Sequence, residues 1–471
     1  MTASFPTELA ANLWTGDGSP VAALDETSRK WGLKPRMEKT SRELAAAEPV
    51  DLRDWRHPKV GWGLVLPDDD TLTAAERATA GDAPEAIREL LAARPGAPVL
   101  RYRAETGARF VRRYYPDGSV QDIAISGAGE RGVAPGALPY YLLIYAGPDA
   151  IPWSFHYLLN QPCFVGRLAL EGTALENYVN ALLTDWRDAG CDPHKPVVWT
   201  VDHGGGDITT LMRKAIAEPV AAKLAADSDI GAGLRLLEDA NATFTALLAA
   251  LAQHSPALIV STSHGQTGPL HDPVAMAARL GAPVDAQHAI LDSDALLAAW
   301  HPDGAIWYAH ACCSAGCDHR NSFKELVPAS SPLSQVLEGV AGLGARIAPL
   351  PQRLLGAAKP LRAFIGHVEP TFDWTLRQPE TGQVLANTTI EALYGRMHRA
   401  QPEPVGMAFN AGYKVVGELF QQWQQLTDQF AGAAPPQRDL IRLMTASAQL
   451  AALDRQSLVI LGDPTVALPA L

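Results

Sequence analysis

Short apolar runs alternate with amphipathic segments along most of the chain, and this alternation predicts the fold. The apolar runs occupy residues 140–147, 196–201, 257–263, 305–311 and 457–462. Segments with the period of amphipathic helices lie at 174–186, 209–226 and 240–253, and residues 387–453 are mainly helical in pattern. Apolar strands separated by such helices indicate an α/β fold, in which a mostly parallel sheet is covered on both faces.

Residues 1–135 have a more polar pattern than the rest of the chain. A helix is expected at 85–94, and residues 101–125 alternate around a Pro-Asp-Gly turn, as the strands of a β-hairpin do. Residues 127–136 (GAGERGVAPG) have the composition of a linker. We therefore expect a smaller α+β N-terminal domain of unknown role over residues 1–135, followed by an α/β domain over residues 136–471.

Acidic residues outnumber basic ones, and this balance bears on the partners of the protein. The 471 residues include 39 Lys and Arg against 51 Asp and Glu, so the formal net charge is −12. Proteins dedicated to nucleic acids or to anionic membranes carry basic surfaces. We therefore expect neither a nucleic acid nor a membrane as a partner.

The cysteines favour a reducing compartment. They number five, at positions 163, 191, 312, 313 and 317, and their odd number and spacing do not fit a disulfide framework. The N-terminal residues lack the basic start and apolar run of a signal peptide, and no apolar run approaches the roughly 18 residues of a membrane span. These features predict a cytoplasmic protein.

Polar loops with potentially catalytic side chains follow three of the apolar runs. They contain His264, Cys312, and the acidic pair Asp202 and Asp207. A cysteine becomes a useful nucleophile when a base or a cation activates it, and His264 is the candidate base. In a parallel sheet functional residues collect where strands end, so the two loops are expected to meet at one edge.

This arrangement predicts thiol-based acyl transfer, most simply hydrolysis. Backbone N–H groups around Gly265 and Cys312 are placed to stabilise an oxyanion. The alternative is structural, with Cys312 as a buried strand cysteine and His264 as a turn residue.

Short motifs around these residues resemble those of caspase-like cysteine peptidases, in particular CHAT-domain and gingipain-like peptidases. In chain order they are YYLLIYAGPDAIPW (140–153), CFVGRLAL (163–170), SHG (263–265), HACCSAG (310–316), AFIGHVEPTFDW (363–374) and LVILGDPTVALP (458–469). Their shared order is the strongest feature of the resemblance, which covers residues 136–471. It implies a three-layer αβα caspase-like fold, with a non-catalytic subdomain at 136–192 and a catalytic subdomain at 193–471.

The resemblance also implies roles for single residues. Cys312 corresponds to the nucleophile, His264 to the histidine that protonates the leaving amine, and Gly265 to the glycine of the oxyanion hole, which Cys312 shares. Cys313 stands at the variable position of the motif. Neither a third acid nor a cofactor is implied. The implied function is a cysteine endopeptidase that cleaves a protein or peptide partner at few positions, as bacterial relatives do in cell-death or defence pathways.

The resemblance places substrate selection just after the first strand of the catalytic subdomain, which corresponds here to Asp202 or Asp207. An acid there favours Arg or Lys before the cleaved bond. Asp207 also precedes a helical segment and fits an N-cap, so Asp202 is the stronger candidate for the pocket. The insertion at 275–290 is a candidate lid.

Three other interpretations stay open. A metal site is suggested by five residues that crowd into ten positions, but no second cluster accompanies them and we expect no metal; they are His310, Cys312, Cys313, Cys317 and His319. The loop HGGGD at 203–207 has glycines suited to a phosphate, without a phosphate-binding motif. Finally, the chain is alternatively a catalytically silent or latent caspase-like scaffold that binds an activating or regulatory protein partner.

Overall fold

The computed structural model describes the chain except for residues 1–7, 11–20, 24–49, 95, 107–108 and 378–380. The chain separates into two compact units, Met1–Asp51 and Leu52–Leu471. In the first unit, β1 (Glu8–Ala10) pairs antiparallel with β2 (Val21–Ala23). All further description concerns the second unit.

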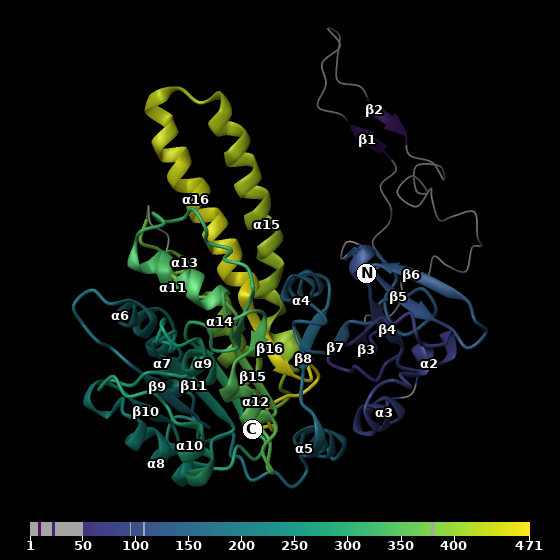
Figure 1. The fold of residues 1–471 in the computed structure, drawn as a ribbon, viewed down its shortest axis with the longest axis horizontal. Coiled ribbons are helices and arrows are strands. Elements are labelled where there is room, and N and C mark those ends of the chain that lie inside the picture. The colour runs from purple at the N-terminus through teal and green to yellow at the C-terminus, as the bar shows by residue number, and fades with distance from the viewer. Residues whose placement is uncertain (1–7, 11–20, 24–49, 95, 107–108, 378–380) are drawn as a thin grey trace. The chain divides into compact units, whose positions relative to one another are not determined.

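A mixed sheet of 12 strands forms the centre of the second unit (Figure 1). In sheet order the strands are β10 (Arg235–Leu237), β9 (Val197–Thr200), β11 (Leu258–Thr262), β12 (Ile306–His310), β15 (Ala363–His367), β16 (Leu458–Gly462), β8 (Phe164–Leu168), β7 (Tyr141–Tyr145), β3 (Trp62–Pro67), β4 (Val99–Tyr102), β5 (Phe110–Tyr114) and β6 (Val120–Ala124). Two groups of neighbouring strands are parallel. The first contains β10, β9, β11, β12 and β15, and the second contains β8, β7, β3 and β4. The predicted α/β class with a mostly parallel sheet is thus confirmed.

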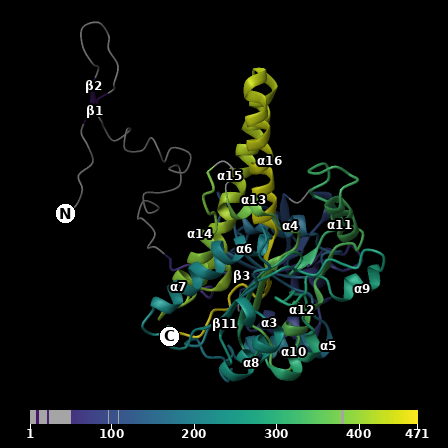
Figure 2. The same cartoon turned by 90° about the vertical axis from the view of Figure 1, so that its left-hand side faces the viewer.

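Helices cover the sheet on both faces, as Figures 1 and 2 show. A continuous layer of helices in mutual contact covers one face: α3 (Glu85–Ala92), α5 (Gly172–Leu183), α12 (Pro349–Leu355), α10 (Ser293–Ala299) and α8 (Phe244–His254). Helices that contact β8, β9 or β11 on the other face include α4 (Trp153–Asn160), the π-helical turn η4 (Arg213–Ala217) between α6 (Ile208–Met212) and α7 (Glu218–Ala226), and α15 (Val405–Gly432). Strands β9, β11, β12 and β15 are buried throughout, because both faces are covered.

The remaining helices are several short ones, of at most ten residues, and one long helical hairpin. The short ones are α2 (Ala74–Thr79), α9 (Pro273–Ala278), α11 (Pro332–Ala341), α13 (Asp373–Leu376), α14 (Asn387–Ile390) and the π-helical turn η6 (Glu391–Arg396). Helix α15 packs along α16 (Pro435–Ser457), and this hairpin extends beyond the sheet in Figure 1. None of the helices among the described residues combines the length and the apolar character needed to cross a membrane.

The division of the chain differs from the expected boundary at residue 135. Strands β3 to β6 continue the same sheet as β7, and the contacts divide the chain after Asp51. The segment 127–136 packs closely against the structure, since a Cβ at Gly132 would lie 2.2 Å from the carbonyl oxygen of Pro58. Glycine content indicated a linker there, whereas the close backbone approach also requires glycine. The hairpin expected within residues 101–125 is present as β5 and β6.

A buried carboxylate ties the C-terminal strand to distant parts of the chain. Asp463 follows β16 and is completely buried. It accepts hydrogen bonds from Trp62 Nε1 at 3.0 Å and from the Thr465 amide at 2.9 Å, and it pairs with Arg94 at 3.3 Å. Its own amide donates to the Tyr178 hydroxyl at 2.7 Å. The carboxylate therefore joins segments that lie far apart in the sequence.

Replacing this carboxylate is expected to destabilise the protein strongly. Asp463→Ala leaves the buried guanidinium of Arg94 without its counter-charge, and we expect the free energy of unfolding to fall by about 3–5 kcal/mol. Asp439→Ala, at a side chain that is 89% exposed in α16, is the matched control, with an expected loss below about 0.5 kcal/mol. Urea unfolding followed by tryptophan fluorescence measures both, and equal losses would contradict a structural role for Asp463.

Candidate functional site

The three polar loops singled out above meet at one edge of the sheet. Strand β11 lies between β9 and β12, all three run parallel, and Thr262 at the end of β11 pairs with both Thr200 and His310. The loops that follow these strands therefore leave the sheet at the same level. This register brings His264 beside the Cys312 loop on one side and the Asp202 to Asp207 loop on the other.

The backbones of Gly265 and Cys312 are in direct contact. A Cβ at Gly265 would lie 1.9 Å from the carbonyl oxygen of Cys312 and 3.1 Å from its nitrogen, so only glycine fits at this position. In the described part of the chain, neither the Gly265 nor the Cys312 amide donates to a backbone carbonyl. No backbone carbonyl therefore competes for these two N–H groups, which the sequence predicts to bind an oxyanion.

Cys312 and Cys313 have different surroundings. Cys312 is partly exposed, and its Sγ accepts the amide N–H of Thr371 at 3.3 Å. Burial of the Cys312 thiol raises its pKa, and the hydrogen bonds with Thr371 only partly oppose this. Cys313 is completely buried with a left-handed φ of 56°, and it packs with Met276 and Leu280. Of the adjacent pair, Cys312 is the accessible thiol.

Asp207 links the helix that follows β9 to His264. One oxygen, Oδ1, caps α6 by accepting the Thr209 amide at 2.8 Å, and the other, Oδ2, lies 3.0 Å from His264 Nε2. Partial burial acts to raise the pKa of Asp207, but the hydrogen bonds from Thr209 and the contact with His264 outweigh it and lower the pKa. An ionised Asp207 accepts a hydrogen bond from Nε2–H, which leaves Nδ1 of a neutral His264 as the nitrogen without a proton.

The ring of His264 hydrogen-bonds Asp207 and has no hydrogen bond to Cys312 among the described residues. The helix cap expected for Asp207 is present, and its second oxygen has a further role that the sequence pattern did not indicate. Only the pairing of β9 with β11 brings Asp207 to His264, so no local signal could have identified this partner.

Asp202 has contacts within its own loop. Its Oδ1 accepts the Gly204 amide at 2.8 Å and the Thr210 hydroxyl at 2.5 Å, and its Oδ2 lies 3.9 Å from Arg213. The hydrogen bond from Thr210 lowers the pKa of Asp202, although burial opposes it. The carboxylate is therefore ionised and partly exposed, beside the loop of the His264 site.

Three side chains at this edge have the composition of a metal site. His203, Asp207 and His264 offer ligand atoms within 4.8 Å of one another. Two histidines and a carboxylate suit a transition metal. His203 Nε2 lies 3.1 Å from the carbonyl oxygen of Asp285, the kind of second contact that orients metal-binding histidines. The sequence pattern singled out Asp207, and His203 only as part of the loop 203–207 considered for a phosphate.

The five residues considered earlier for a metal site do not gather around one point in the described structure. His310 contacts Tyr308 and His367 inside the protein, whereas Cys313 and Cys317 belong to an apolar cluster with Val340. The turn after Cys312 separates these side chains, because successive residues at a strand end point in different directions.

The insertion at 275–290 forms a fixed wall beside the site. Its backbone pairs with the His264 loop. The Val284 amide donates to the carbonyl oxygen of His264 at 3.0 Å, and the Gln266 amide donates to the carbonyl oxygen of Ala282 at 2.9 Å. The buried carboxylate of Asp285 accepts the amides of Phe244, Gln287 and Ala289. Opening as a lid would break the hydrogen bonds that join the insertion to His264, Gln266 and Phe244.

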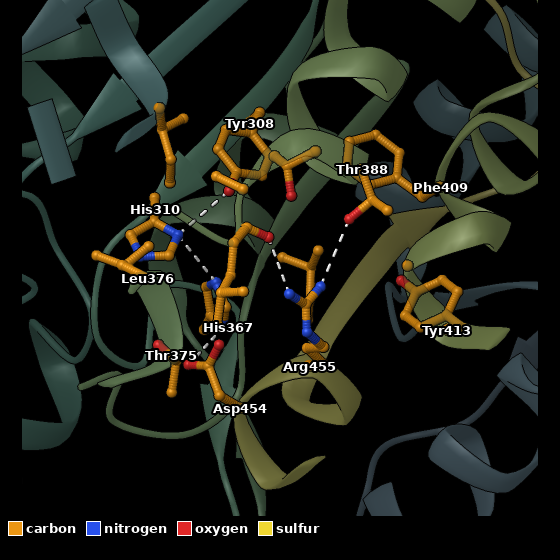
Figure 3. Close-up of a pocket in the computed structure, with 16 residues that line it drawn as sticks. Tyr308, His310, His367, Thr375, Leu376, Thr388, Phe409, Tyr413, Asp454 and Arg455 are labelled. Atoms are coloured by element: carbon orange, nitrogen blue, oxygen red, sulfur yellow. Dashed lines mark hydrogen bonds and ion pairs between the residues drawn. The ribbon is translucent and has the colours of Figure 1, made fainter. Parts of the chain in front are cut away.

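A buried polar network surrounds His310, two residues before Cys312 (Figure 3). It surrounds a cavity of about 50 Å³. Nδ1 of His310 lies 3.2 Å from Nε2 of His367 and 3.2 Å from the Tyr308 hydroxyl oxygen. Burial lowers the pKa of His310 to about 4 and raises the pKa of Asp454, on α16, to about 7. The histidines are therefore neutral near pH 7 and serve as hydrogen-bonding groups.

The same network fixes the position of the Cys312 loop. The Ala315 amide donates to the carbonyl oxygen of His367 at 2.8 Å, and the His367 amide donates to Ser314 Oγ at 3.0 Å. His367 at the end of β15 and Thr371 after it thus hold the Cys312 loop, since Thr371 contacts Sγ itself. The sequence analysis noted residues 363–374 as a motif but did not assign them this supporting role.

Comparisons with known proteins identify no family. No protein-family model matches this sequence, and a search of curated proteins finds no similar chain. The site is therefore interpreted from its geometry and from the short motifs of the sequence.

The exposure and pKa of Cys312 predict a particular pattern of alkylation. In the native protein iodoacetamide is expected to modify Cys312 before the four buried cysteines. Because the thiolate reacts and burial raises the pKa of Cys312, the rate should be low at pH 7 and still increase above pH ~8.5. Peptide mapping by tandem mass spectrometry, with Cys312→Ala as control, measures this. A rate that is already maximal at pH 7, or modification of Cys313 first, would be inconsistent with the structure.

Proposed function

We propose that the protein is a cysteine endopeptidase of caspase-like type that cleaves a protein partner at few positions through Cys312 and His264. The observation that carries the proposal is the contact between the Gly265 and Cys312 backbones, beside an accessible thiol and an imidazole on adjacent strands. The proposal includes the caspase-like three-layer architecture and the assignment of β7 and β8 to a non-catalytic half. The motif resemblance described above supports it.

The proposed reaction begins when a peptide carbonyl enters the site. The proton of the Cys312 thiol passes to His264 Nδ1, and the sulfur forms a bond to the carbonyl carbon while an electron pair moves to oxygen. The Gly265 and Cys312 amides donate to this oxyanion. His264 then gives its proton to the leaving amine as the C–N bond breaks. Water attacks the resulting thioester, releases the acid and restores the thiol.

Asp207 has a positioning role in this proposal. Its contact with His264 Nε2 orients the ring and stabilises the imidazolium that forms during the reaction. This differs from the simple dyad that the resemblance implies. Because Asp207 also caps α6, its effect on His264 has to be measured by a change that keeps the cap, such as Asp207→Asn.

The geometry also favours a latent resting enzyme. His264 and Cys312 share no hydrogen bond among the described residues, and burial raises the pKa of the thiol. Both features fit activation on substrate or partner binding. The silent scaffold that binds a protein partner remains the alternative function.

A second candidate is metal-dependent hydrolysis by the same loops, favoured by the ligand atoms of His203, Asp207 and His264. A metal held there would activate water in place of the thiol. The two candidates differ in their need for Cys312, which gives a direct test.

Peptidase activity is expected to depend on Cys312 and not on Cys313. With a library of fluorogenic peptides, Cys312→Ala and His264→Ala should each lower kcat/KM by about 10³-fold or more, Asp207→Asn by about tenfold through kcat, and Cys313→Ala far less. Activity should persist in the presence of a chelator. Activity that persists in Cys312→Ala and disappears with the chelator would instead establish the metal-dependent reaction. If no variant cleaves peptides, labelling of Cys312 by a peptidyl ketone probe separates a latent enzyme from a silent scaffold.

Substrate preference tests the role of Asp202. If its carboxylate receives the residue before the cleaved bond, wild type prefers Arg or Lys there, and Asp202→Asn lowers kcat/KM for an Arg peptide by about tenfold. The same variant should leave an otherwise identical Ala peptide almost unaffected. An equal loss for both peptides would show that Asp202 only maintains its loop, through Gly204 and Thr210.

A further inference from the structure

A second pocket lies at the opposite edge of the sheet from Cys312. Arg362 precedes β15, and Asp463 follows the antiparallel β16, so both mark the edge where β15 begins. Cys312 follows β12, which is parallel to β15. The five residues of β15 separate the two edges by roughly 16 Å. The pocket is therefore distinct from the candidate catalytic site.

Arginine side chains dominate this pocket, which has a volume of about 550 Å³. The charged residues that line it are Arg53, Arg56, Arg94, Arg362 and Asp185. Asp185 is the one carboxylate among its described lining residues, and Arg94 has Asp463 as its counter-charge. Such a concentration of positive charge stands out in a chain whose net charge is −12.

The deepest of these arginines has a donor without a partner. Arg94 is 5% exposed, and its Nη2 lies 3.3 Å from Asp463 and 3.2 Å from the Thr465 hydroxyl. Its Nη1 is buried with no hydrogen-bond partner among the described residues, and so is Nε of Arg362. A buried, unsatisfied donor of a charged group is costly, so both atoms favour an acceptor inside the pocket.

The arginines are also held close together. The guanidinium carbons of Arg56 and Arg94 each lie 4.1 Å from the centre of the Trp55 ring. Cation–π contacts hold these two groups beside one indole. Burial lowers the pKa of Arg94 and the charge of Arg56 adds to this, although Asp463 opposes it. A bound anion would relieve the repulsion between the two arginines.

We propose that this pocket binds a small, multiply charged phosphate compound. Guanidinium groups recognise phosphate through paired, charge-assisted hydrogen bonds, and the unsatisfied Nη1 of Arg94 and Nε of Arg362 are donors of this kind. The volume of the pocket is that of a small-molecule site. The lining includes Arg53, Trp55 and Arg56 as well as residues 465–469, so a ligand here contacts both ends of this unit.

Calorimetric titration of the full chain with pyrophosphate in 0.15 M salt tests the proposal. We expect saturable binding at one site in wild type, weaker by about tenfold in Arg56→Gln because an exposed cation of the pocket is lost. Arg442→Gln, at a side chain that is 68% exposed on α16, is the matched control and should bind as wild type does. Cys312→Ala should also bind normally, because the pocket is independent of the proposed peptidase.

A second anion and a second variant identify the class of anion that binds and the arginine nitrogen that donates to it. Citrate should bind less tightly than pyrophosphate, and tighter binding of citrate would overturn the assignment to phosphate. Arg94→Lys keeps a cation beside Asp463 but removes Nη1, so it should weaken binding while circular dichroism remains that of wild type. The proposal is overturned if wild type shows no saturable binding, or if Arg56→Gln and Arg442→Gln have equal affinities.

Discussion

The close approach of two backbones, at Gly265 and Cys312, is the constraint on which the candidate catalytic edge depends. It exists because β11 and β12 are neighbours in register, and because glycine alone leaves room for the Cys312 carbonyl. The same register places Asp207 against His264. Three loops that are distant in sequence therefore form one polar site.

Buried polar groups hold this site to the rest of the unit. The end of β15 and the residues after it bind the nucleophile loop, and His367 connects them to His310 and to Ser457 on α16. The carboxylate of Asp285 accepts the amide of Phe244, the first residue of α8, and so holds the segment 275–290 in place beside His264. Each such group is costly to bury alone, so its partners have to be in place together, which favours one arrangement of loops over others.

The two edges of the sheet differ in electrostatic character. At the edge of Cys312, Asp202 and Asp207 supply negative charge close to an imidazole, and burial keeps the thiol mostly protonated. At the edge where β15 begins, arginines collect around Trp55 and leave buried donors unsatisfied. A cationic substrate side chain suits the first edge and an anion suits the second, so one sheet can present opposite preferences that do not interfere.

The sequence pattern predicted the strands β7, β9, β11, β12 and β16, the hairpin of β5 and β6, the longer helices and the polar loops after three of the strands, but it gave no indication of β3 or β10. Apolar runs and helical periods are local signals, and they located β9, β11 and β12 as well as His264 and Cys312 at strand ends. It did not determine the extent of the sheet, because β3 to β6 join it through pairing across the chain. Only the tertiary structure decided that Asp207 contacts His264, that Cys313 is buried, and that Arg94 meets Asp463, since each depends on contacts between segments far apart in sequence.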